Sequence, residues 1–328
     1  MSSSLRALLA GVIDYAGLFP PARLPLDQAV RNYARYRREA DAWMLGRFVI
    51  PAARLPELEP FHEELAGPEG PFVIAVLGRG GEDLNSFLEG LGADLQAAAA
   101  FQERYSRHVR VEVLEVRLPP DAADPARQNG TRVLLDFAAT LISRVGPAGL
   151  TLAYEVGPVP DGRAAVRAVV GSLAWYNALD AVKQRTCCSA GLKLRCGGLE
   201  ASAFPSPEQV AFTIDTCREA GVPLKFTAGL HHPVRHLDPG LQAPVHGFVN
   251  VFAAGVLAHA RRLGAGQLQP ILEDEDASHF VFTDEGLRWQ DLQASTEEIA
   301  AARREAVLSF GSCSFDEPRD DLRALGWL

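Results

Sequence analysis

Short runs of apolar and β-branched residues alternate with longer segments of helical periodicity along this chain. Short runs of this kind are typical of buried strands, whereas apolar positions three and four apart are typical of amphipathic helices. The runs predict seven strands, at residues 11–15, 47–51, 72–77, 109–118, 150–156, 191–196 and 224–228. An eighth strand is expected at 267–272 or 280–282, where the pattern is weaker.

The segments between these strands have the helical period. They predict helices at residues 27–40, 85–105, 130–145, 163–179, 207–220 and 249–263, with a further helix at 296–310. The fifth of these has clear boundaries, because Ser206 suits an N-cap, Pro207 a first turn and Gly221 a C-cap. Residues 318–328 are expected to fold back, with Trp327 as an apolar anchor.

Strands that alternate with helices indicate an α/β fold with a parallel sheet, and eight strands favour closure. An open doubly wound sheet usually carries a glycine-rich phosphate turn after its first strand, but here that strand leads into AGLFPPA. We therefore expect a single (β/α)8 TIM-type barrel over residues 1–328, in which 296–328 form a C-terminal helical extension. Catalytic groups of such barrels lie at the carboxyl ends of the strands.

Composition limits the class of protein. A formal charge of -9 argues against sequence-independent binding to nucleic acid or to an anionic membrane, and no apolar run is long enough for a membrane span. We expect a cytoplasmic protein, and a homo-oligomer is compatible with the sequence. The five cysteines show no zinc-site spacing and are expected to be reduced thiols.

Lysine is nearly absent, since the chain has only Lys183, Lys193 and Lys225 among its 32 basic residues. Arginine replaces lysine well as a surface cation, but only lysine can become a nucleophilic amine. Lys183 lies in a polar Lys-Gln-Arg run and is interpreted as a surface residue. The other two lie inside predicted strands and are the stronger candidates for chemistry.

Alternation along the strands predicts which side chains share a face. In Gly191-Leu-Lys-Leu-Arg-Cys-Gly-Gly198, Lys193 and Arg195 share one face; in Pro223-Leu-Lys-Phe-Thr-Ala-Gly-Leu230, Lys225 and Thr227 do the same. Both lysines are therefore expected to point into the barrel. Burial or a neighbouring cation is expected to lower their pKa values towards neutrality.

Carboxylates occur near the ends of neighbouring strands. Glu155 is the preferred acid or base, Glu115 shares a face with Arg117, and Asp14 lies in the first strand. We expect these groups to converge on the two lysines in one chamber.

The loop after the seventh strand is rich in histidine and contains His231, His232 and Arg235. Adjacent histidines point in different directions, so only one is expected to face a reacting atom; packing in the loop is an equal alternative. Arg235, with Arg195 and Arg117, predicts a receptor for a carboxylate or phosphate, since guanidinium binds such groups in a bidentate fork. Cys313 lies in a glycine- and serine-rich turn and is interpreted as structural.

The two lysine strands resemble those of class I aldolases of the deoxyribose-phosphate aldolase type. The resemblance covers two short segments and implies that Lys193 forms a Schiff base and that Lys225 tunes it electrostatically, with Glu115 or Glu155 as the acidic partner. The sequence differs from that family in Leu-Arg-Cys-Gly-Gly after Lys193, where the family has small hydroxylated residues, and in the histidines after Lys225.

The sequence thus predicts a Schiff-base lyase or isomerase that acts on a small anionic carbonyl metabolite and needs no cofactor. One alternative is a metal-dependent lyase, isomerase or hydrolase using a divalent ion held by His231 or His232 with Glu155 and Asp14. Another is a barrel that binds an anionic metabolite without catalysis.

Overall fold

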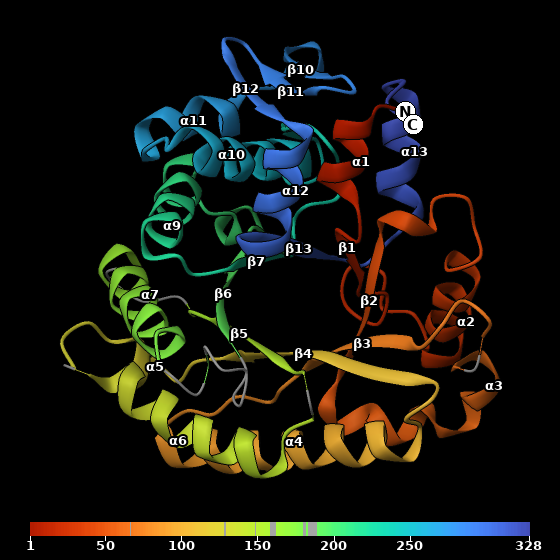
Figure 1. Ribbon diagram of the computed structural model, residues 1–328, viewed down its shortest axis with the longest axis vertical. Coiled ribbons are helices and arrows are strands. Elements are labelled where there is room, and N and C mark those ends of the chain that lie inside the picture. Colours follow the sequence, from red (N-terminus) through yellow and green to blue (C-terminus); the bar gives the residue numbers. More distant parts are fainter. Residues whose placement is uncertain (66, 128, 148, 158–161, 180–181, 183–188) are drawn as a thin grey trace. The chain divides into compact units, whose positions relative to one another are not determined.

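The computed structural model describes residues 1–328 except 66, 128, 148, 158–161, 180–181 and 183–188. It shows a (β/α)8 barrel, closed in the order β1-β13-β7-β6-β5-β4-β3-β2 (Figure 1). The barrel strands are β1 (Ile13–Tyr15), β2 (Leu45–Pro51), β3 (Phe72–Leu77), β4 (Val109–Arg117), β5 (Thr151–Glu155), β6 (Ala190–Arg195), β7 (Leu224–Thr227) and β13 (Val307–Ser312). Seven of them match the predicted strands to within a few residues.

The chain divides into two compact units. Unit 1 comprises Met1–Arg23, Glu39–Gly46 and Leu194–Leu328, and unit 2 comprises Leu24–Arg38 and Arg47–Lys193. In unit 2, strands β3, β4 and β5 pair in parallel. Its helices are α2 (Leu26–Tyr36), α3 (His62–Leu65), α4 (Leu84–Arg104), α5 (Pro120–Ala123), α6 (Gly130–Val145) and α7 (Gly162–Asn177).

Unit 1 contains the parallel strands β1, β13 and β7, in that order. Its helices are α1 (Ser3–Leu9), α9 (Pro207–Ala220), α10 (Phe248–Arg261), α11 (Ala265–Glu273), α12 (Thr296–Glu305) and α13 (Asp316–Ala324). Two small antiparallel sheets complete it: the hairpin β8 (His236–Asp238) and β9 (Ala243–Val245), and the sheet of β10 (Phe280–Phe282), β11 (Gly286–Trp289) and β12 (Leu292–Ser295).

The predicted position of the eighth barrel strand was wrong. Residues 267–272 lie in helix α11, and 280–282 form β10, which pairs with β11 outside the barrel. The eighth strand is β13, which pairs with β1 and β7. The helix expected at 296–310 therefore ends at Glu305. Residues Val307–Ser312 form a strand instead, because two barrel strands supply hydrogen-bond partners for their backbone.

The segment 296–328, expected as a helical extension, therefore contains helices α12 and α13 and also a barrel strand. Trp327 does fold back, as predicted, and its ring lies 5.2 Å from that of Phe282. The predicted boundaries of α9 are confirmed: the Ser206 hydroxyl accepts from the Gln209 amide, and Gly221 adopts a left-handed φ of 63°. No helix in the described part of the chain is long and apolar enough to cross a membrane.

Candidate functional site

Lys193 of β6 lies between two carboxylates in unit 2. Its Nζ is 2.8 Å from Glu115 Oε2 on β4 and 3.0 Å from Glu155 Oε2 on β5. Glu155 is the register partner of Lys193 on the neighbouring strand. Glu115 is the register partner of Ala153, which lies two residues before Glu155 and so on the same face of β5. The side chains of Lys193, Glu155 and Glu115 therefore share one face. Lys193 and Glu115 are buried, whereas Glu155 retains 15% of its side-chain exposure. The cluster therefore reaches solvent on the Glu155 side.

The protonation of Lys193 differs from what the sequence led us to expect. Burial alone lowers the pKa of this ammonium, but the attraction of Glu115 and Glu155, together with their hydrogen bonds, outweighs burial and raises the pKa above its usual value. The expected downward shift is therefore wrong for Lys193, because two carboxylates stabilise the charged form. Lys193 is a cation in the resting protein.

Arg117 ends β4 as the register partner of Glu155, and its side chain is exposed. A side chain at Gly157 would collide with the Arg117 guanidinium, so this glycine leaves the space that the guanidinium occupies. Arg195, at the end of β6, is also exposed. Arg117 thus brings a positive charge beside the loop that follows Glu155, where an anionic group could bind in a bidentate manner.

Lys225 of β7 belongs to a second buried cluster, in unit 1. Its ammonium pairs with the Asp14 carboxylate of β1 and lies 3.1 Å from Ser309 Oγ of β13. The Ser309 hydroxyl donates to Asp14 over 2.7 Å. Asp14 is fully buried, and Lys225 is 2% and Ser309 1% exposed. This cluster joins three neighbouring strands and is closed to solvent.

The carboxylates predicted to accompany the lysines are therefore in place, Glu115 and Glu155 at Lys193 and Asp14 at Lys225. That both lysines share one chamber stays a prediction. Thr227, on the same face of β7 as Lys225, is half-buried, and a side-chain carbon at Gly311 of β13 would lie 3.2 Å from its hydroxyl oxygen.

The two adjacent histidines both contact helix α13. His231 Nδ1 lies 3.0 Å from Glu317 Oε2, and His232 Nδ1 lies 2.6 Å from Asp321 Oδ2. These carboxylates are four residues apart and so lie on one face of the helix. The loop after β7 is thereby fastened to α13 at two points.

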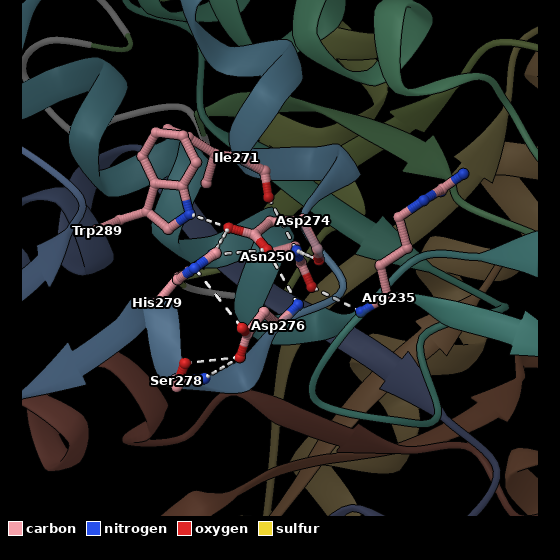
Figure 2. Close-up of polar contacts among 8 residues, drawn as sticks. All are labelled: Arg235, Asn250, Ile271, Asp274, Asp276, Ser278, His279 and Trp289. Atoms are coloured by element: carbon pink, nitrogen blue, oxygen red, sulfur yellow. Dashed lines mark hydrogen bonds and ion pairs between the residues drawn. The ribbon is translucent and has the colours of Figure 1, made fainter.

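Arg235 is held by its backbone, which donates to Asn250 Oδ1 over 2.8 Å. The Asn250 amide donates in turn to the carbonyl oxygens of Ile271 and Asp274, and Asn250 is fully buried. The Asp274 carboxylate accepts from Trp289 Nε1 over 2.7 Å. Figure 2 shows this network, with the Arg235 side chain extending away from it. The network holds the backbone of Arg235 in place, whereas its guanidinium points away from the network.

The same network includes further residues that follow Asp274. His279 Nδ1 lies 2.8 Å from the Asp274 carboxylate, and Asp276 accepts from the amide and hydroxyl of Ser278 (Figure 2). These contacts hold the turn that follows α11, and the hydrogen bond from Trp289 Nε1 to Asp274 joins this turn to the sheet of β10, β11 and β12. They hold Asp274, whose carbonyl oxygen accepts from Asn250, and Asn250 in turn accepts from the backbone of Arg235.

The remaining polar candidates show no metal centre: the described residues contain no group of three or more His, Cys, Asp or Glu side chains that could hold a metal ion. Cys196 and Cys217 are buried, and burial raises the pKa of both thiols. Lys183, Cys187 and Cys188 lie outside the described residues.

Similarity to known proteins is found at the level of solved structures. No family model matches the chain, and no curated protein matches it. Among solved structures, the chain is similar to the Penicillium canescens endo-1,4-beta-xylanase XylE, with 12% sequence identity and a TM-score of 0.36. The match covers 69% of this chain and 72% of the xylanase chain.

Sequence reasoning missed Ser309, Glu317 and Asp321, which contact the predicted residues. Ser309 lies in the strand that was expected to be helical, so its position beside Lys225 could not be inferred. Glu317 and Asp321 have the spacing of one helical face and follow the loop histidines in sequence by many residues. Their i, i+4 spacing was the available signal.

Proposed function

We propose that this protein is a Schiff-base lyase or isomerase in which the Lys193 amine attacks the carbonyl of a small anionic substrate. The observation that carries the proposal is the position of Lys193 Nζ, 2.8 Å and 3.0 Å from two carboxylates on adjacent strands. Barrels of this fold carry their active sites at the carboxyl ends of the strands, but the fold alone does not name a reaction. The residues of the cluster are what suggest one.

The first step requires a neutral amine. Transfer of a proton from Lys193 to Glu155 removes charge from both groups. Because the carboxylates raise the pKa of Lys193, this transfer costs free energy in the resting protein, and burial, which by itself lowers the pKa, reduces that cost. The amine nitrogen then bonds to the carbonyl carbon, and the carbonyl oxygen takes up the proton. Glu155 suits this exchange because it is the more exposed of the two carboxylates.

In the second step, the two carboxylates stabilise a positive charge on the Lys193 nitrogen. Loss of water from the carbinolamine produces a protonated imine, whose positive charge lies where the ammonium had been. Glu115 and Glu155 stabilise that cation as they stabilise the resting ammonium, so the imine stays protonated and can accept electrons from a breaking C–C or C–H bond. The enamine that results takes up a proton at carbon to become an imine again, and hydrolysis of that imine releases the product and restores Lys193.

Substrate binding is assigned to arginine. The Arg117 guanidinium lies beside Gly157, two residues after Glu155, and is exposed, so it can bind a carboxylate or phosphate near the reacting amine. Arg195, two residues after Lys193 on β6, is a second exposed cation. Both suit a small anionic metabolite rather than a neutral one.

A second candidate function is favoured by the raised pKa of Lys193. An ammonium that keeps its proton can stabilise an oxyanion or enolate without forming an imine, while Glu155 moves the proton. In that reaction the lysine stays unmodified throughout. The two candidates differ in whether a covalent bond forms to Lys193.

The test is borohydride trapping with a panel of small aldehydes and keto acids, followed by intact-mass measurement. The wild type is compared with Lys193→Arg, Lys225→Arg and the control Lys183→Arg, which together cover every lysine of the chain. An adduct that disappears only in Lys193→Arg supports the proposal. An adduct that disappears only in Lys225→Arg would assign the imine to the other cluster. If no carbonyl compound gives an adduct, imine chemistry is rejected.

A further inference from the structure

A cysteine, a histidine and a glutamate meet at the end of the last barrel strand in unit 1. Cys313 follows β13 directly, and its Sγ lies 4.0 Å from His231 Nδ1. Glu317, on α13, lies 3.0 Å from the same nitrogen. The proposed imine chemistry uses none of these three residues, so any function of this cluster is separate from it.

The histidine of this cluster carries a positive charge. Its contact with Cys313 and its hydrogen bond to Glu317 raise the pKa of His231 to about 10, although partial burial opposes the shift. His231 in turn lowers the pKa of Glu317. An imidazolium therefore faces the sulfur at neutral pH. Cysteines that lie beside an imidazolium are typically the reactive ones, because the thiolate is the nucleophile in cysteine oxidation.

Accessibility distinguishes Cys313 from the other described cysteines. Cys313 is 9% exposed, whereas Cys196 is fully buried and Cys217 is 2% exposed. Neither of those two has a cation among its described contacts, and burial alone disfavours their thiolates. Cys313 is therefore the most exposed of these three cysteines.

We propose that Cys313 is an oxidation site for hydroperoxides and that His231 is the residue which makes its sulfur reactive. The thiolate sulfur attacks one peroxide oxygen, so that an S–O bond forms and the O–O bond breaks. Sulfur is oxidised by two electrons and the peroxide is reduced. The leaving hydroxide takes a proton from the His231 imidazolium and departs as water, and Cys313 remains as a sulfenic acid.

His232 provides a matched control. It is the neighbour of His231, it is similarly exposed, and it also binds a carboxylate of α13, but it does not contact Cys313. If His231 only fastens α13 to the loop, replacing either histidine should have the same effect. If His231 activates the sulfur, only its own replacement should slow oxidation.

The experiment is a short pulse of hydrogen peroxide at pH 6 in the presence of dimedone, which traps sulfenic acids, followed by tryptic mapping. The fragment 305–319 contains Cys313 alone, 196–218 contains Cys196 and Cys217, and 186–193 contains Cys187 and Cys188. Wild type, His231→Gln and His232→Gln are compared. We expect the fragment 305–319 to be labelled before 196–218. In His231→Gln we expect labelling of 305–319 to be roughly tenfold slower. A cysteine that loses a neighbouring cation has a smaller thiolate fraction, but each thiolate is then a better nucleophile, which limits the effect.

Labelling in His232→Gln should stay within about twofold of wild type on the same argument. Equal slowing in both variants, no slowing in His231→Gln, or labelling of 196–218 first would each overturn the proposal. If His231→Gln does not fold, the ultraviolet thiolate absorbance of wild type is compared with that of Cys313→Ser at pH 6. A thiolate signal that disappears in Cys313→Ser supports the proposal, and the absence of such a signal overturns it.

Discussion

Replacing Lys193 by methionine should strongly destabilise the protein near neutral pH. Methionine is of similar length and removes only the charge, so Glu115, with 3% side-chain exposure, is left as a buried carboxylate without its cation. Breaking a buried ion pair in this way costs about 3–5 kcal/mol. Glu155 is more exposed and can be hydrated, so it adds less to the loss.

The free energy contributed by this cluster should depend on pH near neutrality in the variant but not in the wild type. The raised pKa of Lys193 means that its ammonium contributes stability fully below its unfolded pKa of about 10.4, and that this contribution disappears only as the pH rises through the higher folded value. In Lys193→Met, Glu115 has lost the Lys193 ammonium, and this buried carboxylate is instead stabilised by taking up a proton. Its contribution then grows as the pH falls, by at most about 1.4 kcal/mol per pH unit.

The assay is urea unfolding of both proteins at pH 7.5 and pH 5.5. We expect the difference in unfolding free energy to shrink by up to about 2.7 kcal/mol at the lower pH. Arg54→Met is the control, because Arg54 and Glu57 form an exposed pair, and its loss should cost less than about 1 kcal/mol at either pH. A Lys193→Met protein as stable as the wild type at pH 7.5, with no gain on acidification, would refute the buried three-charge cluster.

Three further changes test other parts of the structure. Gly157→Ala should displace the Arg117 guanidinium and raise the KM for an anionic substrate more than it lowers kcat, which steady-state kinetics would reveal; an unchanged KM would argue against Arg117 as an anion receptor. Asn250→Ala should lower the free energy of unfolding by about 2–4 kcal/mol, because one buried and two partly buried backbone groups lose their partner, and a loss below about 1 kcal/mol would contradict the network. Ser309→Ala should cost about 1–3 kcal/mol in urea unfolding through the lost bond to Asp14, and a neutral result would show that this hydroxyl is not needed.

Most of the barrel follows from local patterns in the sequence. Strands β3 to β7 combine apolar runs with clear flanking helices, and α9 carries its own start and stop signals in Ser206 and Gly221. Such signals depend on neighbouring residues and can therefore be read from one chain. Strand β13 lacks them: its buried and half-buried positions do not alternate, and it follows α12 with almost no linker. Only pairing with β1 and β7 makes it a strand.

The candidate site shows the same division between local and distant information. Alternation predicts that Lys193, Glu155 and Glu115 share a face, because neighbouring parallel strands keep their side chains in step. It does not predict the net effect on the pKa of Lys193, which depends on two opposing contributions and on their distances. The contact of His231 with Cys313 likewise depends on where β13 lies.

The pairing of β1 with β13 also bears on how the chain folds during synthesis. Ile13 and Phe310 are register partners, so one edge of the first strand stays unpaired until Phe310 has left the ribosome. Until then β1 has unsatisfied backbone groups, and the Asp14 carboxylate lacks the Ser309 hydroxyl that completes its cluster. Contacts between residues so distant in sequence slow folding, and exposed strand edges invite aggregation. One edge of the first strand therefore stays exposed in the nascent chain until β13 has been synthesised.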